Sequence, residues 1–176
     1  MNAIYGFVWL LALFVWGDWR NPKKYYSTYL FFLLGDFLYL YFFSDYYPMW
    51  SYAPQGFDED IGLTNTHVVL SIMAIKYPAT ILIFLGRYPG DQSWVKQLIY
   101  ILMWSSIYGI NEALDLFFGL ITYDNGWSIW WSVLFNFVMF SILRLHFVRP
   151  LRAWVASSIF ILILWHVFDV PSSVFR

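Results

Sequence analysis

Residues 109–119 read GINEALDLFFG and lie between the apolar stretches ILMWSSIY (101–108) and LITY (120–123). The flanks are typical of a helix that crosses lipid, where every backbone polar group must be satisfied within the structure. Asn111, Glu112 and Asp115 interrupt that pattern, and ionisable groups are costly in hydrocarbon. Such groups are tolerated when they face the interior of a bundle, so the stretch predicts a membrane-embedded helical bundle with a polar interior.

The composition of the whole chain supports the same class of protein. Of the 176 residues, 61% are hydrophobic, 24% are aromatic and only 12% are charged. A soluble domain has about 25% charged residues, so this chain has too few to cover a surface in water. The net charge of −1 and the absence of a basic tract exclude a nucleic-acid partner, and the absence of Cys excludes thiol catalysis, thiolate metal sites and disulfides.

A membrane-spanning helix needs about 20 mostly apolar residues. The predicted fold is therefore all-α: a polytopic membrane helical bundle of six transmembrane helices, forming a single integral membrane domain over residues 1–176. The N-terminal stretch lacks a basic start and a small-residue cleavage site, so we expect a retained first span. The six expected spans are Asn2–Trp16, Tyr25–Phe43, Leu63–Leu85, Lys96–Tyr123, Trp127–Val148 and Leu151–Val170.

The positions of the basic residues predict the orientation. Eight of the ten Lys and Arg residues lie in or beside the first, third and fifth connections. The second and fourth connections contain Asp and Glu residues but no Lys or Arg. Because basic residues are retained on the cytoplasmic side, we expect a multi-pass protein of the cytoplasmic membrane with both termini outside. The eight basic residues are Arg20, Lys23, Lys24, Arg87, Lys96, Arg144, Arg149 and Arg152.

Four stretches together carry a resemblance: IYGFVWLLALFVWGDWRN (4–21), KYPATILIFLGRYP (76–89), ITYDNGW (121–127) and LRLHFVRPLRAW (143–154). The chain resembles an uncharacterised family of small multi-span integral membrane proteins from spore-forming Gram-positive bacteria. The resemblance implies a bacterial membrane protein of about this length. It implies no activity and transfers no functional residue.

Polar residues inside the expected spans are the candidates for a functional site. Helical spacing places Glu112 and Asp115 on one stripe, and His166 and Asp169 on another, because residues three apart share a face. Depth along the helices places Lys76 near Asp36 and Glu112, which predicts an internal ion pair. The set forms either a polar cavity that opens outward or a buried network. Its members are Asp36, His67, Lys76, Asn111, Glu112, Asp115, His166 and Asp169.

The known catalytic motifs do not fit this set. Carboxylates with two His residues could bind a divalent metal, but the H-E-x-x-H pattern is missing, and we expect no metal and no cofactor. The G-x-G-D pattern of aspartyl membrane proteases and a G-x-S-x-G serine setting are also missing. Asp36 and Asp124 could be read as the two aspartates of such a protease, but Asp124 of YDNG is expected in a turn outside the spans.

Three functions stay open at this stage. The favoured one is a non-catalytic sensor or accessory subunit, whose intramembrane charges form a packed network. The first alternative is a transporter or carrier of protons, cations or a small polar solute through an outward-facing polar site. The second is a membrane enzyme acting on lipid or wall-precursor headgroups. The expected partners are membrane lipids, and a homo-oligomer or larger membrane complex is left open.

Overall fold

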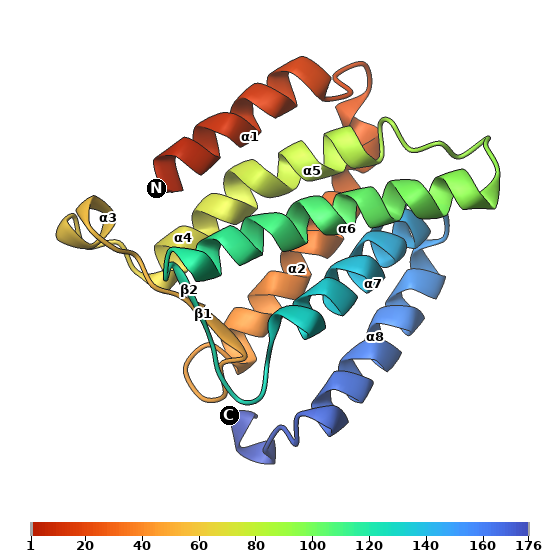
Figure 1. The fold of residues 1–176 in the computed structure, drawn as a ribbon. Coiled ribbons are helices and arrows are strands. Elements are labelled where there is room, and N and C mark those ends of the chain that lie inside the picture. Colours follow the sequence, from red (N-terminus) through yellow and green to blue (C-terminus); the bar gives the residue numbers. More distant parts are fainter. Residues whose placement is uncertain (1, 176) are drawn as a thin grey trace.

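The computed structural model describes residues 2–175 and is mostly helical. Six long helical segments run alternately between two ends of the molecule (Figure 1). They are α1 (Asn2–Trp16), α2 (Tyr26–Phe42), the continuous segment α4 (Asn65–Ser71), η2 (Ile72–Lys76) and α5 (Tyr77–Phe84), α6 (Trp94–Phe117), α7 (Ile129–Val148) and α8 (Pro150–Val167). The short elements are η1 (Pro22–Tyr25), β1 (Trp50–Tyr52), α3 (Phe57–Asp60), β2 (Ile121–Tyr123) and η3 (Ser172–Val174).

The helices match the six expected segments closely, but the all-α prediction needs a correction. Strands β1 and β2 form an antiparallel pair, in which Ser51 is the partner of Thr122. The fourth segment was expected to stay helical to Tyr123, but α6 ends at Phe117. Gly119 then adopts a positive φ of 68°, which residues with a side chain rarely adopt, and this reverses the chain into β2.

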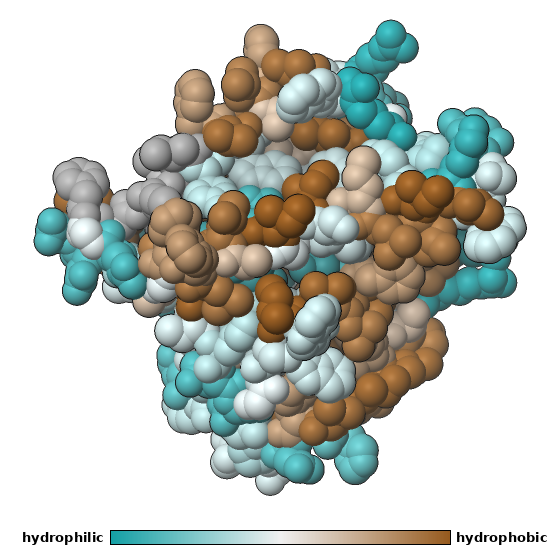
Figure 2. Space-filling view, viewed as in Figure 1, coloured by the Kyte–Doolittle hydropathy of each residue, from teal (hydrophilic) through white to brown (hydrophobic). Residues whose placement is uncertain are grey.

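Three helical segments are long and apolar enough to cross a membrane: Asn65–Phe84, Ile129–Val148 and Pro150–Val167. The apolar part of α1 described in the structure, Tyr5–Trp16, is shorter than a full span. On the face shown in Figure 2, hydrophobic residues lie over much of the helices, and the most hydrophilic residues lie mainly at the margins of the molecule. This surface is typical of a membrane protein.

The segment from α4 to α5 is the centre of the packing. It contacts α1, α2 and the strand β1. Ala79, Thr80, Ile81 and Phe84 are completely buried. The Phe84 ring packs on Phe140 of α7 at a centroid distance of 5.0 Å. Small residues such as Ala79 and Thr80 let helices approach closely, which is how helix pairs are stabilised in a membrane.

One end of the molecule, here called the basic end, carries the connections α1–α2, α5–α6 and α7–α8 (Figure 1). All eight basic residues predicted to share one side lie in or beside these connections. The opposite end carries β1, β2 and both ends of the described chain, and we call it the strand end. Its connections carry acidic residues such as Glu59 and Asp124.

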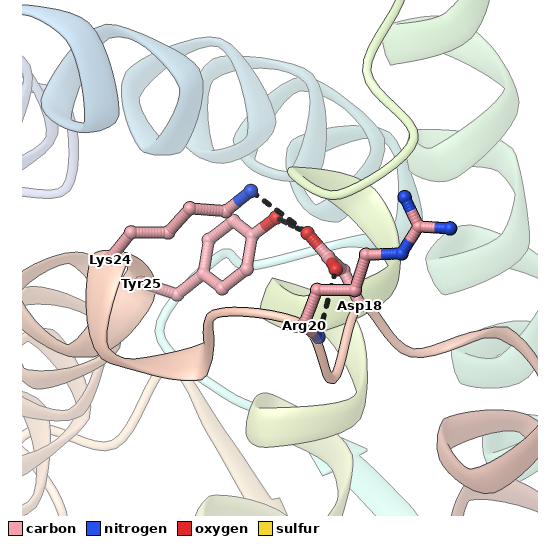
Figure 3. A network of polar contacts seen from close by, with 4 residues as sticks. All are labelled: Asp18, Arg20, Lys24 and Tyr25. Atoms are coloured by element: carbon pink, nitrogen blue, oxygen red, sulfur yellow. Dashed lines mark hydrogen bonds and ion pairs between the residues drawn. The ribbon is translucent and has the colours of Figure 1, made fainter.

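A polar network fixes the α1–α2 connection at the basic end (Figure 3). The Asp18 carboxylate lies 2.8 Å from the Lys24 ammonium and accepts hydrogen bonds from the Tyr25 hydroxyl at 2.5 Å and the Arg20 backbone N–H at 3.2 Å. These donors, Lys24 first and then Tyr25, lower the pKa of Asp18 to about 2. Gly86 of the α5–α6 connection lies so close to Asp18 that a Cβ on Gly86 would be 2.7 Å from the Asp18 Cβ.

The strand end is closed by aromatic side chains. The Tyr39 hydroxyl of α2 donates to the Trp50 carbonyl at 2.8 Å and accepts from the backbone N–H groups of Met49 and Trp50, each at 3.0 Å. The Tyr39 and Trp50 rings stack at 4.0 Å. The predicted YDNG turn is confirmed, because the Trp127 N–H donates to the Asp124 carbonyl at 3.0 Å. These bonds hold β1 and β2 over the bundle.

Candidate functional site

A cavity of about 650 Å³ lies between α2, η2, α6, α7 and α8. Its lining has a polar part and a larger apolar part. The polar part is contributed by Asp36, Tyr39, Tyr52, Lys76, Tyr77, Tyr108, Glu112, Asp115, Ser132, Asn136 and Ser157. Four of the eight residues predicted from the sequence therefore line one cavity, and we call Asp36, Lys76, Glu112 and Asp115 the charged cluster.

Helices α2, α7 and α8 contribute most of the apolar part of the cavity. Leu34 and Leu38 of α2 and Ile161 of α8 line it, and all three also have a relative exposure of 39–47%. Helix α8 packs mainly on α7. The cavity is thus bounded on this side by two helices whose apolar side chains also face outward, where lipid would contact them.

The strand end of the cavity is covered. Met49, Ile121 and Trp127 line it there, and each has a relative exposure below 8%. The sequence left open whether the charged residues face an outward-opening cavity or a buried network. The structure shows a cavity, and buried residues of β2 and of the connections beside β1 and β2 are part of its lining.

Asp36 and Glu112 are held by hydroxyl donors. The Tyr77 hydroxyl donates to the Asp36 carboxylate. Glu112 accepts hydrogen bonds from the Tyr123 hydroxyl at 2.7 Å and from the Ser132 hydroxyl at 2.6 Å. Burial raises the pKa of Tyr123, so its hydroxyl stays protonated and donates at neutral pH. These two carboxylates are therefore fixed in position.

The Glu112 site is extended by an indole. Trp127 donates its ring N–H to the Ser132 oxygen at 2.8 Å, and the Ser132 hydroxyl in turn donates to Glu112. Ser132 lies in the first turn of α7, and Trp127 lies in the connection before it. The chain of donors ties α6, the strand end and α7 to one carboxylate, which explains why Glu112 is tolerated among apolar helices.

Asp115 differs from the other two carboxylates. The Asp115 side chain is only partly exposed. It has no hydrogen-bond partner among the side chains that the structure describes, which are those of residues 5–56 and 59–175. It lies one helical turn beyond Glu112, so the predicted shared stripe is confirmed for this pair. Asp115 is therefore the carboxylate of the cluster whose oxygens are least engaged by the protein.

Lys76 lies in the π-helical turn η2. Pro78 has no N–H to donate to the carbonyl of residue 74, and the helix widens into the π-turn directly before it. The Lys76 ammonium lies 4.1 Å from the centroid of the Tyr108 ring and 5.7 Å from that of Trp9. Both are within the range of cation–π attraction.

The predicted ion pair of Lys76 with Asp36 or Glu112 is not formed. Among the described side chains, no carboxylate oxygen lies within 4.0 Å of the Lys76 ammonium. The carboxylates of Asp36, Glu112 and Asp115 attract Lys76 at longer range. Equal depth along neighbouring helices did not reveal that the ammonium lies over aromatic rings.

The other four predicted site residues do not line the cavity. His67 is exposed and caps the start of α4, where its Nδ1 lies 2.8 Å from the Thr64 hydroxyl. Asn111 donates to the Ile107 carbonyl of its own helix at 2.7 Å. His166 and Asp169 are exposed, and the predicted stripe between them fails because α8 ends at Val167 and Asp169 adopts a φ of +47°.

Sequence reasoning missed the hydroxyl groups of the cavity. The side chains of Tyr77, Tyr123 and Ser132 supply the donors that hold Asp36 and Glu112. Tyrosine is frequent throughout the chain, with 14 residues, so its presence alone indicated nothing. A signal did exist for Tyr77, because it neighbours Lys76 in a segment interrupted by Pro78.

Within the described part of the chain, no three His, Asp or Glu side chains are arranged to hold a metal ion. The cavity can instead hold an organic molecule. Cavities of about 300–1,000 Å³ that are mostly apolar, with a few positioned polar groups, are typical small-molecule sites. Comparison of the chain with protein-family models, with curated proteins and with solved structures finds no match.

Proposed function

We propose that this protein is a non-catalytic membrane protein, a sensor or an accessory subunit, that binds one amphiphilic molecule in the cavity. The observation that carries the proposal is the two-part lining, in which the charged cluster faces the same cavity as many apolar side chains, several of them from α2 and α8. A molecule with a polar head and an apolar chain satisfies both parts at once. In this proposal the charged cluster is part of a binding site, whereas the sequence led us to expect a packed network.

The surroundings of the cavity favour entry from the membrane. The strand end is covered by buried side chains such as Ile121 and Trp127. The α2–α8 side is lined by partly exposed apolar residues such as Leu34 and Leu162. An amphiphile already dissolved in the bilayer would reach this side with its chain still in an apolar environment. The ligand source we propose is therefore the bilayer itself.

The proposal includes a topology. Six helices would cross a bacterial cytoplasmic membrane, with the basic end inside and both termini outside, which is the arrangement the positive-inside bias favours. A reporter fused after Gly90, at the basic end, should be cytoplasmic, and one inserted at Gly56, at the strand end, should be external. Finding both reporters on the same side would contradict the topology.

Gly35 offers a direct test of the binding function. It lines the cavity, and a Cβ placed on it would meet nothing within 4 Å. Gly35→Trp should therefore fill part of the cavity without disturbing the backbone, and Gly35→Ala is the matched control that leaves the space open. The protein would be purified in nanodiscs and then released from them in the mass spectrometer, where native mass spectrometry counts the amphiphiles that stay bound to it.

We expect one amphiphile bound per chain in the parent and in Gly35→Ala, and none in Gly35→Trp. Equal occupancy in all three proteins would show that the cavity is not the binding site. A folded parent that retains no amphiphile, even when a mixed membrane lipid extract is added, would overturn the proposed function.

A carrier of protons or cations is the second candidate, and one observation favours it. Asp115 lies next to Glu112 in the cavity without a described hydrogen bond, so its carboxylate is available to a passing ion. A carrier would show cation-dependent transport in proteoliposomes that Asp115→Asn abolishes. A binding protein would show ligand retention without transport.

A further inference from the structure

We infer that the amphiphile bound in the cavity carries a cationic head, an alkylammonium, which lies against Asp115 with Asp36 and Glu112 nearby. The inference rests on the proposed function and adds the chemical class of the ligand. It is carried by the charges that line the cavity, by the position of the one ammonium the protein supplies, and by the aromatic surface at the strand end.

The charged cluster has an excess of negative charge. Asp36, Glu112 and Asp115 contribute three carboxylates and Lys76 contributes one ammonium, so the formal charge of the ionised cluster is −2. Uncompensated charge in a low-dielectric site is strongly unfavourable. A cationic ligand would reduce this excess, whereas an anionic head would increase it.

The protein does not place its own ammonium against the carboxylates. Lys76 is held over the Tyr108 ring, and no described carboxylate oxygen lies within 4.0 Å of it. Hydroxyl groups occupy Asp36 and Glu112, but a hydroxyl brings no charge. The carboxylate of Asp115 is left with neither a described donor nor a close counter-charge. An ammonium at Asp115 would supply both.

The rest of the lining suits an organic cation better than a hydrated metal ion. Trp50, stacked on Tyr39, lies 5.1 Å from the Trp127 ring, and all three side chains line the cavity. Ring faces attract organic ammonium groups through cation–π interaction. The apolar residues of α2 and α8 would cover an alkyl chain, which a metal ion lacks. The charge, the rings and the apolar side therefore select the same ligand class.

The test uses three probes with the same twelve-carbon chain: dodecylammonium, neutral dodecanol and anionic dodecanoate. Binding to the protein in nanodiscs of zwitterionic lipid would be followed by tryptophan fluorescence, with empty nanodiscs subtracted to remove simple partitioning. We expect dodecylammonium to bind at least about tenfold more tightly than either other probe, a difference of about 1.4 kcal/mol. Gly35→Trp should abolish the binding of every probe that enters the cavity.

Two substitutions should move the affinity in opposite directions. Asp115→Asn should weaken dodecylammonium binding by about tenfold and leave dodecanol unchanged, whereas Lys76→Gln should strengthen it, because it removes the competing cation. Asp169→Asn is the matched control: Asp169 is exposed, lies outside the cavity lining and has a positive φ that Asn tolerates. If either variant protein fails to fold, the other still tests whether the affinity for dodecylammonium changes in the expected direction.

The outcomes separate this inference from the proposed function. Equal or tighter binding of dodecanol or dodecanoate, still blocked by Gly35→Trp, would overturn the cationic head and keep the amphiphile site. Dodecylammonium binding that is unaffected by both Asp115→Asn and Lys76→Gln would also overturn it. If Gly35→Trp blocks the binding of none of the three probes, both the cationic head and the amphiphile site would be overturned.

Discussion

The segment Asn65–Phe84 and the helix α8 are both long and apolar enough to cross a membrane, yet 56% of the residues in the apolar stretch of the first are buried inside the protein and only 6% of those in the second. The difference is in their contacts. The first segment packs against α1 and α2, whereas α8 packs mainly on α7. Apolarity identifies a helix that lipid accepts, but it does not distinguish a helix that forms the core from one that borders it.

The two regions consequently have different roles. The α4–α5 segment positions Lys76 and Tyr77 at the cavity from a buried centre. Helix α8 is anchored at its two ends, where Ala153 and Phe168 are buried, and the Tyr47 hydroxyl donates to the Phe168 carbonyl at 2.8 Å. Its middle turns border the cavity. The first segment therefore contributes more to stability, and α8 borders the side by which we propose that a ligand enters.

The largest effect should come from truncating matched residues in the two regions. Ile81 of α5 has a relative exposure of 0% and Ile159 of α8 one of 54%. Ile81→Ala should lower the free energy of unfolding by about 2–5 kcal/mol, because it leaves a hole in a close-packed core. Ile159→Ala should change it by no more than about 0.5 kcal/mol. Denaturant unfolding in detergent measures both, and equal losses would show that α8 is also part of the core.

Two glycines sharpen the same comparison with a smaller effect. A Cβ on Gly86 would lie 2.4 Å from the Leu82 carbonyl oxygen and 2.7 Å from the Asp18 Cβ, whereas a Cβ on Gly35 meets nothing within 4 Å. Gly86→Ala should destabilise the protein by about 1–3 kcal/mol through overpacking. Gly35→Ala should stabilise it by up to about 1 kcal/mol, because Ala is the better helix former.

Thermal unfolding of the two alanine variants beside the parent checks this prediction. Opposite signs are expected for the two shifts in unfolding temperature. A loss at Gly35 as large as that at Gly86 would indicate that the cavity is filled by protein and that α2 is packed as tightly as α5.

The helical segments could be predicted from the sequence because each depends on a local property, a run of apolar residues of sufficient length. The pairing of β1 with β2 could not, since it joins Ser51 and Thr122 across 71 positions and its strands have three residues each. The turn at Asp124–Gly126 was predictable, because Asn-Gly favours the positive φ values that both residues adopt.

Half of the candidate site could be predicted, for a related reason. Helical spacing relates residues of one helix, so it placed Glu112 and Asp115 together. It does not show how far a helix extends, which is why His166 and Asp169 were paired wrongly at the end of α8. It also does not show what lies between helices, which is why the rings around Lys76 were missed.

The smallest effect concerns the Asp18–Lys24 pair, which joins the basic end of α1 to that of α2 and has no counterpart on α8. The hydrogen bonds from Lys24 and Tyr25 lower the pKa of Asp18 from 3.8 to about 2 in the folded protein. Above about pH 4 both the folded and unfolded chains keep this carboxylate ionised, and the pair contributes its full stabilisation. As the pH falls toward 2 the unfolded chain binds the proton first, so the contribution is lost over that window. Exposed ion pairs contribute at most about 1 kcal/mol, so the shift in unfolding midpoint will be small.

Asp18→Asn removes the titrating group and keeps its shape, so the parent should be the more stable of the two at pH 7 and should lose that advantage between about pH 4 and pH 2. Asp91→Asn, at the same basic end, is the matched control substitution. The alkaline side gives an independent check, because the Asp18 hydrogen bond raises the pKa of Lys24 above 10.5. The stabilisation from Lys24 is present below the ordinary pKa of lysine and is lost as the pH rises through its raised value in the folded protein. An Asp18→Asn protein whose unfolding midpoint follows the parent at every pH would show that packing of Gly86 and Tyr25, without the ion pair, holds this end of the bundle together.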